Sequence, residues 1–221
     1  MEKYAVIVAG GQGNRMNSSI PKQFMLLNDI PILIHVIKKI YVADKNIKII
    51  IALPKKNNVL TLWKNLCKKY KCNIPHTIIF GGKTRFESVK NSLAQIKTNN
   101  GIVLIHDGVR PLVSQKLITS CISSVKKNIG VVPVIPLKDS IRKLKNKCSV
   151  SITRSNLFAV QTPQCFNISE IKQAYKQTTS VRFTDDATVF ENAGGSIILI
   201  PGEENNIKIT TKLDLKVASL L

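Results

Sequence analysis

The chain has 221 residues, of which 44% are hydrophobic, and 33 basic residues against 13 acidic ones give it a formal net charge of +20. That length and apolar content suffice for one domain with a real core, which excludes disordered and fibrous proteins. The basic residues occur as pairs along the whole chain, without one long run and with few aromatic residues among them. A nucleic-acid groove would cluster its charges and interleave aromatics, so the charge favours a lysine-rich surface over a specific nucleic-acid partner.

The cysteines and the apolar runs indicate the compartment. Five cysteines form an odd set without a CxxC pair, and the three histidines lack zinc-ligand spacing. This predicts reduced, structural thiols in a cytoplasmic protein. No stretch of 18 uncharged apolar residues occurs, and the apolar run near the start is too short for a signal peptide. We therefore expect no association with a membrane.

Apolar periodicity predicts strands that alternate with helices from the start of the chain. The first strand covers residues 4–9, and a glycine-rich loop follows it. The first helix spans residues 31–41, with Asp29 at the N-cap position and Pro31 in the first turn. The alternation continues with strands at 47–53, 77–80, 102–106 and 130–135 and helices at 59–70, 85–96 and 116–126. Strands that are apolar on both faces predict a mostly parallel sheet in a three-layer α/β fold.

Residues 140–153 interrupt this alternation. Two short strands, 141–144 and 150–153, flank a polar turn and predict a hairpin that projects from the domain. An isolated hairpin is marginally stable in water, so it needs a surface to pack on, either a second subunit or its own domain. The alternation of strands and helices resumes in the last part of the chain, with elements at 186–193, 196–200, 207–210 and 212–220. No repeat or linker divides the chain, and we expect a single domain over residues 1–221.

The loop after the first strand combines small residues with cations: Ala9, Gly10, Gly11, Gly13, Arg15 and Lys22. Ligands of open α/β sheets bind at the carboxyl ends of the strands, and glycines let backbone N–H groups approach phosphates closely. The loop lacks the third glycine of a dinucleotide fingerprint, which disfavours a dehydrogenase, and it lacks a Walker A motif. Its arginine and lysine suit a nucleotide triphosphate. A surface turn with incidental basic residues is the alternative.

This loop, with the Pro-Lys-Gln-Phe that follows it, resembles the signature of the sugar nucleotidyltransferases, in particular of the cytidylyltransferases that make CDP-linked polyols. Similar motifs follow in order to the end of the chain: GGKTRFESV from Gly81, HDGVRP from His106, KDS from Lys138, RS from Arg154, QTPQ from Gln161, TDDA from Thr184 and NIKIT from Asn206. The resemblance implies a Rossmann-like nucleotidyltransferase domain. It also implies attack by the oxygen of a polyol phosphate on the α-phosphorus of CTP, with release of pyrophosphate.

The resemblance further implies a role for individual residues. Arg15, Lys22 and Lys208 would be catalytic, because they would neutralise the triphosphate and the transition state. The residues expected to bind CTP are Ala9, Gly10, Gly11, Gly13, Gly82, Arg85, Ser88 and Gly108. Asp107 would hold Mg²⁺ or another divalent cation between phosphate oxygens. Without the resemblance, Lys208 would be interpreted as a strand-edge lysine and Asp107 as a helix N-cap.

The second substrate and the assembly are also implied by the resemblance. The residues expected to bind the polyol phosphate are Arg110, Ser140, Arg154, Thr162 and Thr184. In relatives the projecting hairpin crosses to a neighbouring subunit, so we expect residues 137–156 to act as the arm of a homodimer. Arg110, Ser140 and Arg154 would then complete the site of the partner. His106 is interpreted as a packed structural residue, and Arg85, at the start of a helix, is expected to have an anionic or polar partner.

Two branches of the family fit the motifs. Segments such as QTPQ and TDDA resemble the branch that uses a methylerythritol phosphate, whereas His-Asp-x-Val-Arg-Pro leans toward the branch that uses ribitol 5-phosphate. The chain departs from the usual family pattern at Gly10, at Gly108-Val109, at Ser140 and at Thr153. We expect the methylerythritol branch, in its form without a second fused enzyme domain. A basic nucleic-acid-binding protein is the distant alternative.

Overall fold

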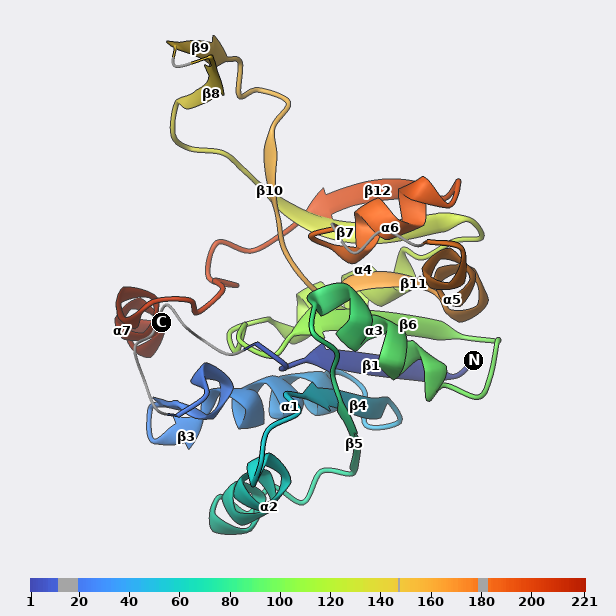
Figure 1. The fold of residues 1–221 in the computed structure, drawn as a ribbon, viewed down its shortest axis with the longest axis vertical. Coiled ribbons are helices and arrows are strands. Elements are labelled where there is room, and N and C mark those ends of the chain that lie inside the picture. Colours follow the sequence, from blue (N-terminus) through green and yellow to red (C-terminus); the bar gives the residue numbers. More distant parts are fainter. Residues whose placement is uncertain (12–19, 147, 179–182) are drawn as a thin grey trace.

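The computed structural model describes residues 1–11, 20–146, 148–178 and 183–221 (Figure 1). Its centre is an eight-stranded sheet in the order β10-β7-β11-β6-β1-β4-β5, with β12 also paired to β7. The strands of this sheet are β1 (Lys3–Val8), β4 (Lys48–Leu53), β5 (His76–Phe80), β6 (Ile102–Asp107), β7 (Ile129–Pro136), β10 (Phe158–Val160), β11 (Gln164–Asn167) and β12 (Ser196–Pro201).

Most neighbouring strands of the sheet are parallel. β1 pairs in parallel with β4 and β6, β4 with β5, and β7 with β12. β11 is antiparallel to both β6 and β7, and β10 is antiparallel to β7. The expected mostly parallel sheet is therefore confirmed, with two antiparallel strands that periodicity did not predict.

Helices cover both faces of the sheet (Figure 1). One layer contains α1 (Ile32–Ala43), α2 (Val59–Lys69) and α4 (Gln115–Ser123), and the other contains α3 (Arg85–Ala94), α5 (Ile168–Gln177) and α6 (Asp186–Asn192). Successive side chains of β1 alternate between the two layers: Ala5 and Ile7 pack in the first, Tyr4 and Val6 in the second. This alternation confirms the three-layer α/β fold.

Two local expectations were wrong. Asp29 does not cap α1, because Asn28 and Asp29, with φ of 46° and 62°, form the turn between β2 (Leu26–Leu27) and β3 (Ile30–Pro31). A two-residue hairpin turn of this kind requires positive φ at both positions. The expected element at residues 207–210 is not a strand in the described structure. Its apolar Ile209 is instead buried in a small cluster with Ala218 of α7 (Lys212–Leu220).

The hairpin projects from the domain, as expected. β8 (Ile141–Lys145) and β9 (Cys148–Ile152) pair with each other in a separate two-stranded sheet. Figure 1 shows them beyond the body of the domain, at the end of two extended segments. The apolar side chains of Leu144 and Val150 are 76% and 46% exposed. In this single chain the hairpin therefore leaves apolar surface uncovered.

The helix lengths and the state of the cysteines follow directly from the structure. Among the described residues, no helix combines the length and the apolar character that crossing a bilayer requires. All five cysteines lie in the described ranges, and all five are free thiols.

The core of the sheet gives a direct test of the fold. Phe166 of β11 is fully buried, and its ring lies 5.1 Å from that of Phe190 in α6. We expect Phe166→Ala to lower the free energy of unfolding by about 3–5 kcal/mol, because it leaves a cavity between the layers. Urea denaturation would measure this change. Val42→Ala at an exposed position of α1 is the control and should cost less than about 0.5 kcal/mol. Equal losses for the two variants would contradict the described packing.

Candidate active site

Two adjoining cavities lie at the carboxyl ends of the parallel strands. The larger has a volume of about 600 Å³ and is lined by the segments that follow β1, β4, β5 and β6. The smaller, of about 380 Å³, lies between the end of β6, residues 160–164 and residues 184–188. Arg85, Asp107 and Lys208 line both cavities, so these three side chains form the boundary between them.

Glycines bring backbone segments close together around the larger cavity. A Cβ atom on Gly81 would lie 2.6 Å from the Oγ of Ser88, and one on Gly108 would lie 3.0 Å from the Cβ of Ala9. The Ser88 hydroxyl accepts a hydrogen bond from the N–H of Gly82 (3.1 Å) and donates one to the N-cap carbonyl of α3 (2.9 Å). Ser88 therefore lines the cavity and also fixes the shape of the glycine turn.

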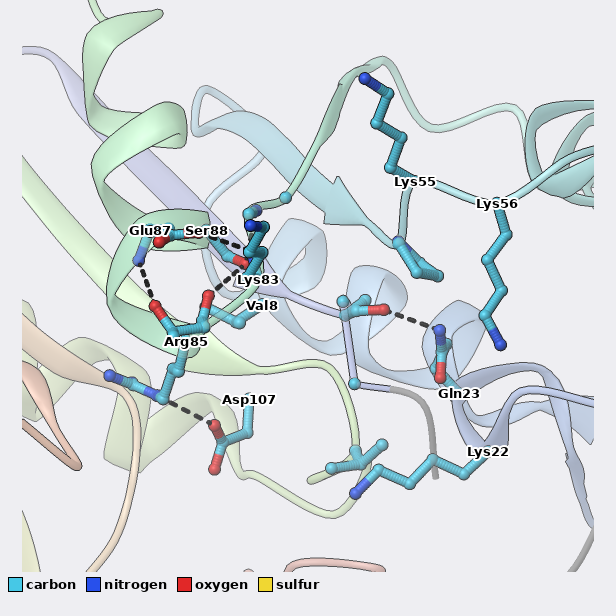
Figure 2. A pocket seen from close by; sticks show the side chains of 18 of the residues that line it. Val8, Lys22, Gln23, Lys55, Lys56, Lys83, Arg85, Glu87, Ser88 and Asp107 are labelled. Atoms are coloured by element: carbon cyan, nitrogen blue, oxygen red, sulfur yellow. Dashed lines mark hydrogen bonds and ion pairs between the residues drawn. The ribbon is translucent and has the colours of Figure 1, made fainter. Parts of the chain in front are cut away.

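Cationic side chains outnumber acidic ones in the lining of this larger cavity (Figure 2). The cations are Lys22, Lys55, Lys56, Lys83, Arg85 and Lys208, and the acids are Glu87 and Asp107. Such a surplus of positive charge suits a polyanionic ligand. Lys55 and Lys56 were not expected from the sequence, although their position directly after β4 could have revealed them, since ligands bind at strand ends.

The two residues that follow Lys22 fix its position. The side chain of Gln23 is buried, and its Nε2 donates a hydrogen bond to the carbonyl oxygen of Ala9 (2.7 Å). The ring of Phe24 is buried and stacks on Trp63 of α2, with 5.8 Å between centroids. These contacts hold the short 3-10 turn Lys22–Phe24 against β1 and α2. Figure 2 shows the Lys22 side chain extending from this turn toward the strand end that carries Asp107.

Asp107, the last residue of β6, contacts three cations although its side chain is only 8% exposed. Its Oδ2 lies 3.0 Å from the Nζ of Lys208 and 3.2 Å from the Nε of Arg110, and its Oδ1 lies 3.8 Å from the Nε of Arg85. Burial alone would raise the pKa of Asp107, but Lys208, Arg85 and Arg110 outweigh it and hold this pKa well below its usual range. The carboxylate is therefore ionised at neutral pH.

Both arginines that contact Asp107 are anchored by further partners. Arg85 donates two hydrogen bonds to Asp186, at 2.9 and 2.6 Å. Burial alone would lower the pKa of Arg85, but the charge of Asp186 raises it instead. The Nη1 of Arg110 donates to the carbonyl oxygen of Asn206 (2.8 Å). The expected anionic partner of Arg85 is thus present, and it is Asp186.

A chain of hydrogen bonds orients Thr162 in the smaller cavity. The N–H of Asp107 donates to the Oγ1 of Thr162 (3.1 Å), whose hydroxyl in turn donates to the Nδ1 of His106 (2.9 Å). The Nε2–H of His106 then donates to the carbonyl oxygen of Arg110 (3.1 Å). With Nε2 protonated toward this carbonyl, a neutral imidazole leaves Nδ1 as the acceptor of the Thr162 proton. Burial indeed lowers the pKa of His106 to about 4, although the nearby Asp107 opposes the shift, which agrees with the interpretation of His106 as a packed residue.

Most of the site residues expected from the sequence lie at these two cavities. The larger is lined by Ala9, Gly10, Gly11, Lys22, Gly82, Arg85, Ser88, Asp107 and Lys208, and Arg110, Thr162 and Thr184 line the smaller. Gly108 lies directly behind this wall, against Ala9. Arg15 and Gly13 lie outside the described residues. Ser140 and Arg154 are exposed near the hairpin and line neither of the two cavities in this chain.

Four buried polar side chains around the smaller cavity were not expected from the sequence: Gln161, Gln164, Asp186 and Asn206. The Oε1 of Gln164 accepts the N–H of Asp186 (3.0 Å), and the Nδ2 of Asn206 donates to the carbonyl oxygen of Thr162 (2.8 Å). All four lie within motifs that the sequence analysis had singled out. The motifs located these residues, but only the fold reveals which of them face inward.

Comparison with known proteins gives a consistent match. A family model described as IspD, 2-C-methyl-D-erythritol 4-phosphate cytidylyltransferase, matches residues 4–221. The protein of that name from Azobacteroides pseudotrichonymphae is 46% identical, over 100% of this chain and 98% of its own length. The crystal structure of the Francisella tularensis protein of that name is 28% identical with a TM-score of 0.81, covering 100% of this chain and 99% of the other. The bifunctional IspDF of Campylobacter jejuni is 30% identical with a TM-score of 0.80, and the match covers 98% of this chain and 54% of that one.

The depressed pKa of His106 makes stability depend on pH. The unfolded chain binds a proton at this histidine below pH ~6.5, whereas the folded chain resists protonation down to a pKa of about 4. Stability is therefore complete above pH ~6.5 and falls as the pH drops toward 4. From this group we expect a loss of about 2 kcal/mol between pH 7 and pH 5, measured by urea denaturation. His106→Gln, which does not titrate, should remove most of this loss, and an unchanged slope would contradict the assignment.

Proposed function

The chain belongs to the 2-C-methyl-D-erythritol 4-phosphate cytidylyltransferase family, and from this premise we propose a role for each of its two cavities. It is a nucleotidyltransferase of isoprenoid biosynthesis that joins the cytidylyl group of CTP to 2-C-methyl-D-erythritol 4-phosphate and releases pyrophosphate. Full-length relatives carry this name, so neither ribitol 5-phosphate nor a nucleic acid is favoured as the ligand. We also place the reaction in the cytoplasm, which the five free cysteines support.

The observation that carries the proposal is the boundary shared by the two cavities. In our proposal CTP occupies the larger cavity. Its lining is cationic, and its glycines let backbone N–H groups come close to the phosphates. The polyol phosphate occupies the smaller one, where Arg110 offers a guanidinium for a phosphate and Thr162 and Thr184 offer hydroxyl groups. The α-phosphorus of CTP then lies at the boundary, beside Lys208, within reach of an oxygen of the second substrate.

This reaction needs no strong base from the protein. A phosphate monoester is already anionic at neutral pH, so catalysis consists of aligning two anions and stabilising the charge that develops between them. Lys22 and Lys208 neutralise the triphosphate from two sides of the larger cavity, and we assign Arg15 to the same task. Thr162, held by His106 and the backbone of Asp107, orients the second substrate.

The residues present fit a divalent cation at Asp107. Its ionised carboxylate is a hard oxygen ligand of the kind that Mg²⁺ prefers, and Mg²⁺ commonly combines one carboxylate with substrate phosphates and water. Among the described residues no three His, Cys, Asp or Glu side chains form a metal cluster, so the phosphates of CTP would complete the coordination. The cation would withdraw charge from the phosphate oxygens.

An assay of pyrophosphate release tests the proposed function. With CTP and Mg²⁺, we expect the protein to release pyrophosphate with 2-C-methyl-D-erythritol 4-phosphate and far more slowly with ribitol 5-phosphate. Lys22→Ala should lower kcat by about 10²–10³-fold, the loss typical of a preorganised group that stabilises transition-state charge.

Lys64→Ala, at an exposed position of α2 outside both cavities, is the matched control and should leave the activity unchanged. Preference for ribitol 5-phosphate would overturn the choice of substrate. Equal activity of the Lys22 and Lys64 variants would refute the assignment of the site.

We propose that the projecting hairpin completes the site of a second subunit. Ser140 and Arg154, the expected ligands of the polyol phosphate, are exposed and line neither cavity of their own chain within its described residues. The exposed apolar side chains of Leu144 and Val150 suit burial against another protein surface. A homodimer in which residues 137–156 reach the neighbouring subunit accounts for both observations.

Mixing two inactive variants tests this arrangement. Lys22→Ala inactivates the site of its own subunit, whereas Arg154→Ala should inactivate the site of the partner. A mixed dimer then contains one intact site, so random reassociation should restore about a quarter of the wild-type activity if each dimer is twofold symmetric. Mixing Lys22→Ala with Lys208→Ala is the control and should restore nothing, because both residues line the same cavity. Failure of the first mixture to recover activity would show that Arg154 acts within its own subunit.

A further inference from the structure

The carboxylate that the proposed function assigns to a divalent cation is already paired in the free protein. The Oδ2 of Asp107 has the ammonium of Lys208 at 3.0 Å and the guanidinium of Arg110 at 3.2 Å. A magnesium ion would bind a carboxylate oxygen at ~2.0–2.1 Å. Three positive groups would then crowd one buried oxygen, and their repulsion is weakly screened there. On Oδ1 the metal would meet the guanidinium of Arg85, whose Nε lies 3.8 Å from that atom. Departure of one of the present cations would relieve this repulsion when the metal binds.

Lys208 is the cation that can leave. The guanidinium of Arg85 is held by two hydrogen bonds to Asp186, and that of Arg110 by the carbonyl oxygen of Asn206. The Lys208 side chain is 42% exposed. Among the described residues it forms one ion pair, which is the pair with Asp107. Its release costs no further buried contact.

The backbone on both sides of Lys208 is fixed. Asn206 is fully buried, and its Nδ2 donates to the carbonyl oxygen of Thr162 (2.8 Å). Ile209 is also fully buried, and its N–H donates to the carbonyl oxygen of Val109 (2.9 Å). Rotation of the Lys208 side chain alone can therefore carry its ammonium away from Asp107, without movement of the segment.

We propose that Lys208 and the divalent cation exchange places on Asp107. In the free protein the Lys208 ammonium is paired with the Asp107 carboxylate. When the metal and CTP bind, the ammonium moves from Asp107 to the α-phosphate. The exchange makes Lys208 available at the reacting phosphate only when the metal and the nucleotide are both in place. It rests on the proposed function for the identity of the ligands.

Binding of Mn²⁺ without nucleotide, followed by electron paramagnetic resonance, tests the exchange. Wild-type protein should bind Mn²⁺ weakly, and Lys208→Met should bind it at least about ten-fold more tightly, because one close positive charge is removed. Lys208→Arg keeps the charge and should stay weak. Lys55→Met removes a charge from the same cavity away from Asp107 and should change the affinity by less than about two-fold. Asp107→Asn added to Lys208→Met should abolish the tighter binding.

Wild-type crystals give a second measurement that does not depend on the folding of a variant. Soaked with MnCl₂ alone, they should show no manganese on Asp107. With MnCl₂ and CTP together, manganese should lie on Asp107 and the Nζ of Lys208 beyond hydrogen-bonding distance of its carboxylate. Manganese on Asp107 with the Lys208 ion pair intact would overturn the exchange, as would unchanged affinity of Lys208→Met. Absence of pyrophosphate release from the wild-type protein would refute the proposed function instead, and the two failures are therefore distinguishable.

Discussion

The pairing of Asp107 with three cations is the interaction on which the site depends. These charges come from segments that are distant in the sequence: the end of β6, the first turn of α3 and the segment before α7. A buried carboxylate without partners would be strongly unfavourable, so folding must bring these segments together. Because Asp186 joins through Arg85, the cluster of ion pairs around Asp107 contains two carboxylates and three cations, which leaves one positive charge in surplus. The free protein thus retains a positive field where two anions would meet.

The antiparallel strand β11 connects the fold to this charge cluster. It pairs with β6 in the register Gln164 opposite Ile105, and the loop that precedes it therefore lies beside the end of β6. That placement lets the N–H of Asp107 reach the hydroxyl of Thr162. A purely parallel sheet would put a helical crossover before each strand, and the smaller cavity would lose this wall. The reversed direction of β11 therefore creates the second cavity beside the first.

The sequence predicted the helices and strands whose apolar side chains pack into the core between the layers. Each expected parallel strand and each helix of the first 126 residues is present, with ends shifted by a few residues. β11 and α5 were missed because Asn167 ends one and caps the other, so no loop marks a change of period. The apolar residues at 207–210 were wrongly predicted to form a strand. An apolar pattern indicates that side chains are buried, but it does not indicate which part of the protein buries them. Ile209 is buried by α7 and Val109.

For the site, as for the fold, the sequence indicated which residues take part but not which residues they contact. The resemblance of the motifs to those of the nucleotidyltransferase family located Lys22, Asp107, Arg110 and Lys208. The motifs did not reveal that Asp107 pairs with Arg85, Arg110 and Lys208, since the pairs with Arg85 and Lys208 join segments 22 and 101 residues apart. Some cations form no ion pair within the ranges that the structure describes, such as Lys55 and Lys56 at the cavity wall, and a bound polyanion would balance their charge. The negative charge of the substrate thus balances the cavity cations that the protein itself does not neutralise. The same cations that bind the substrate also stabilise the negative charge that develops in the transition state.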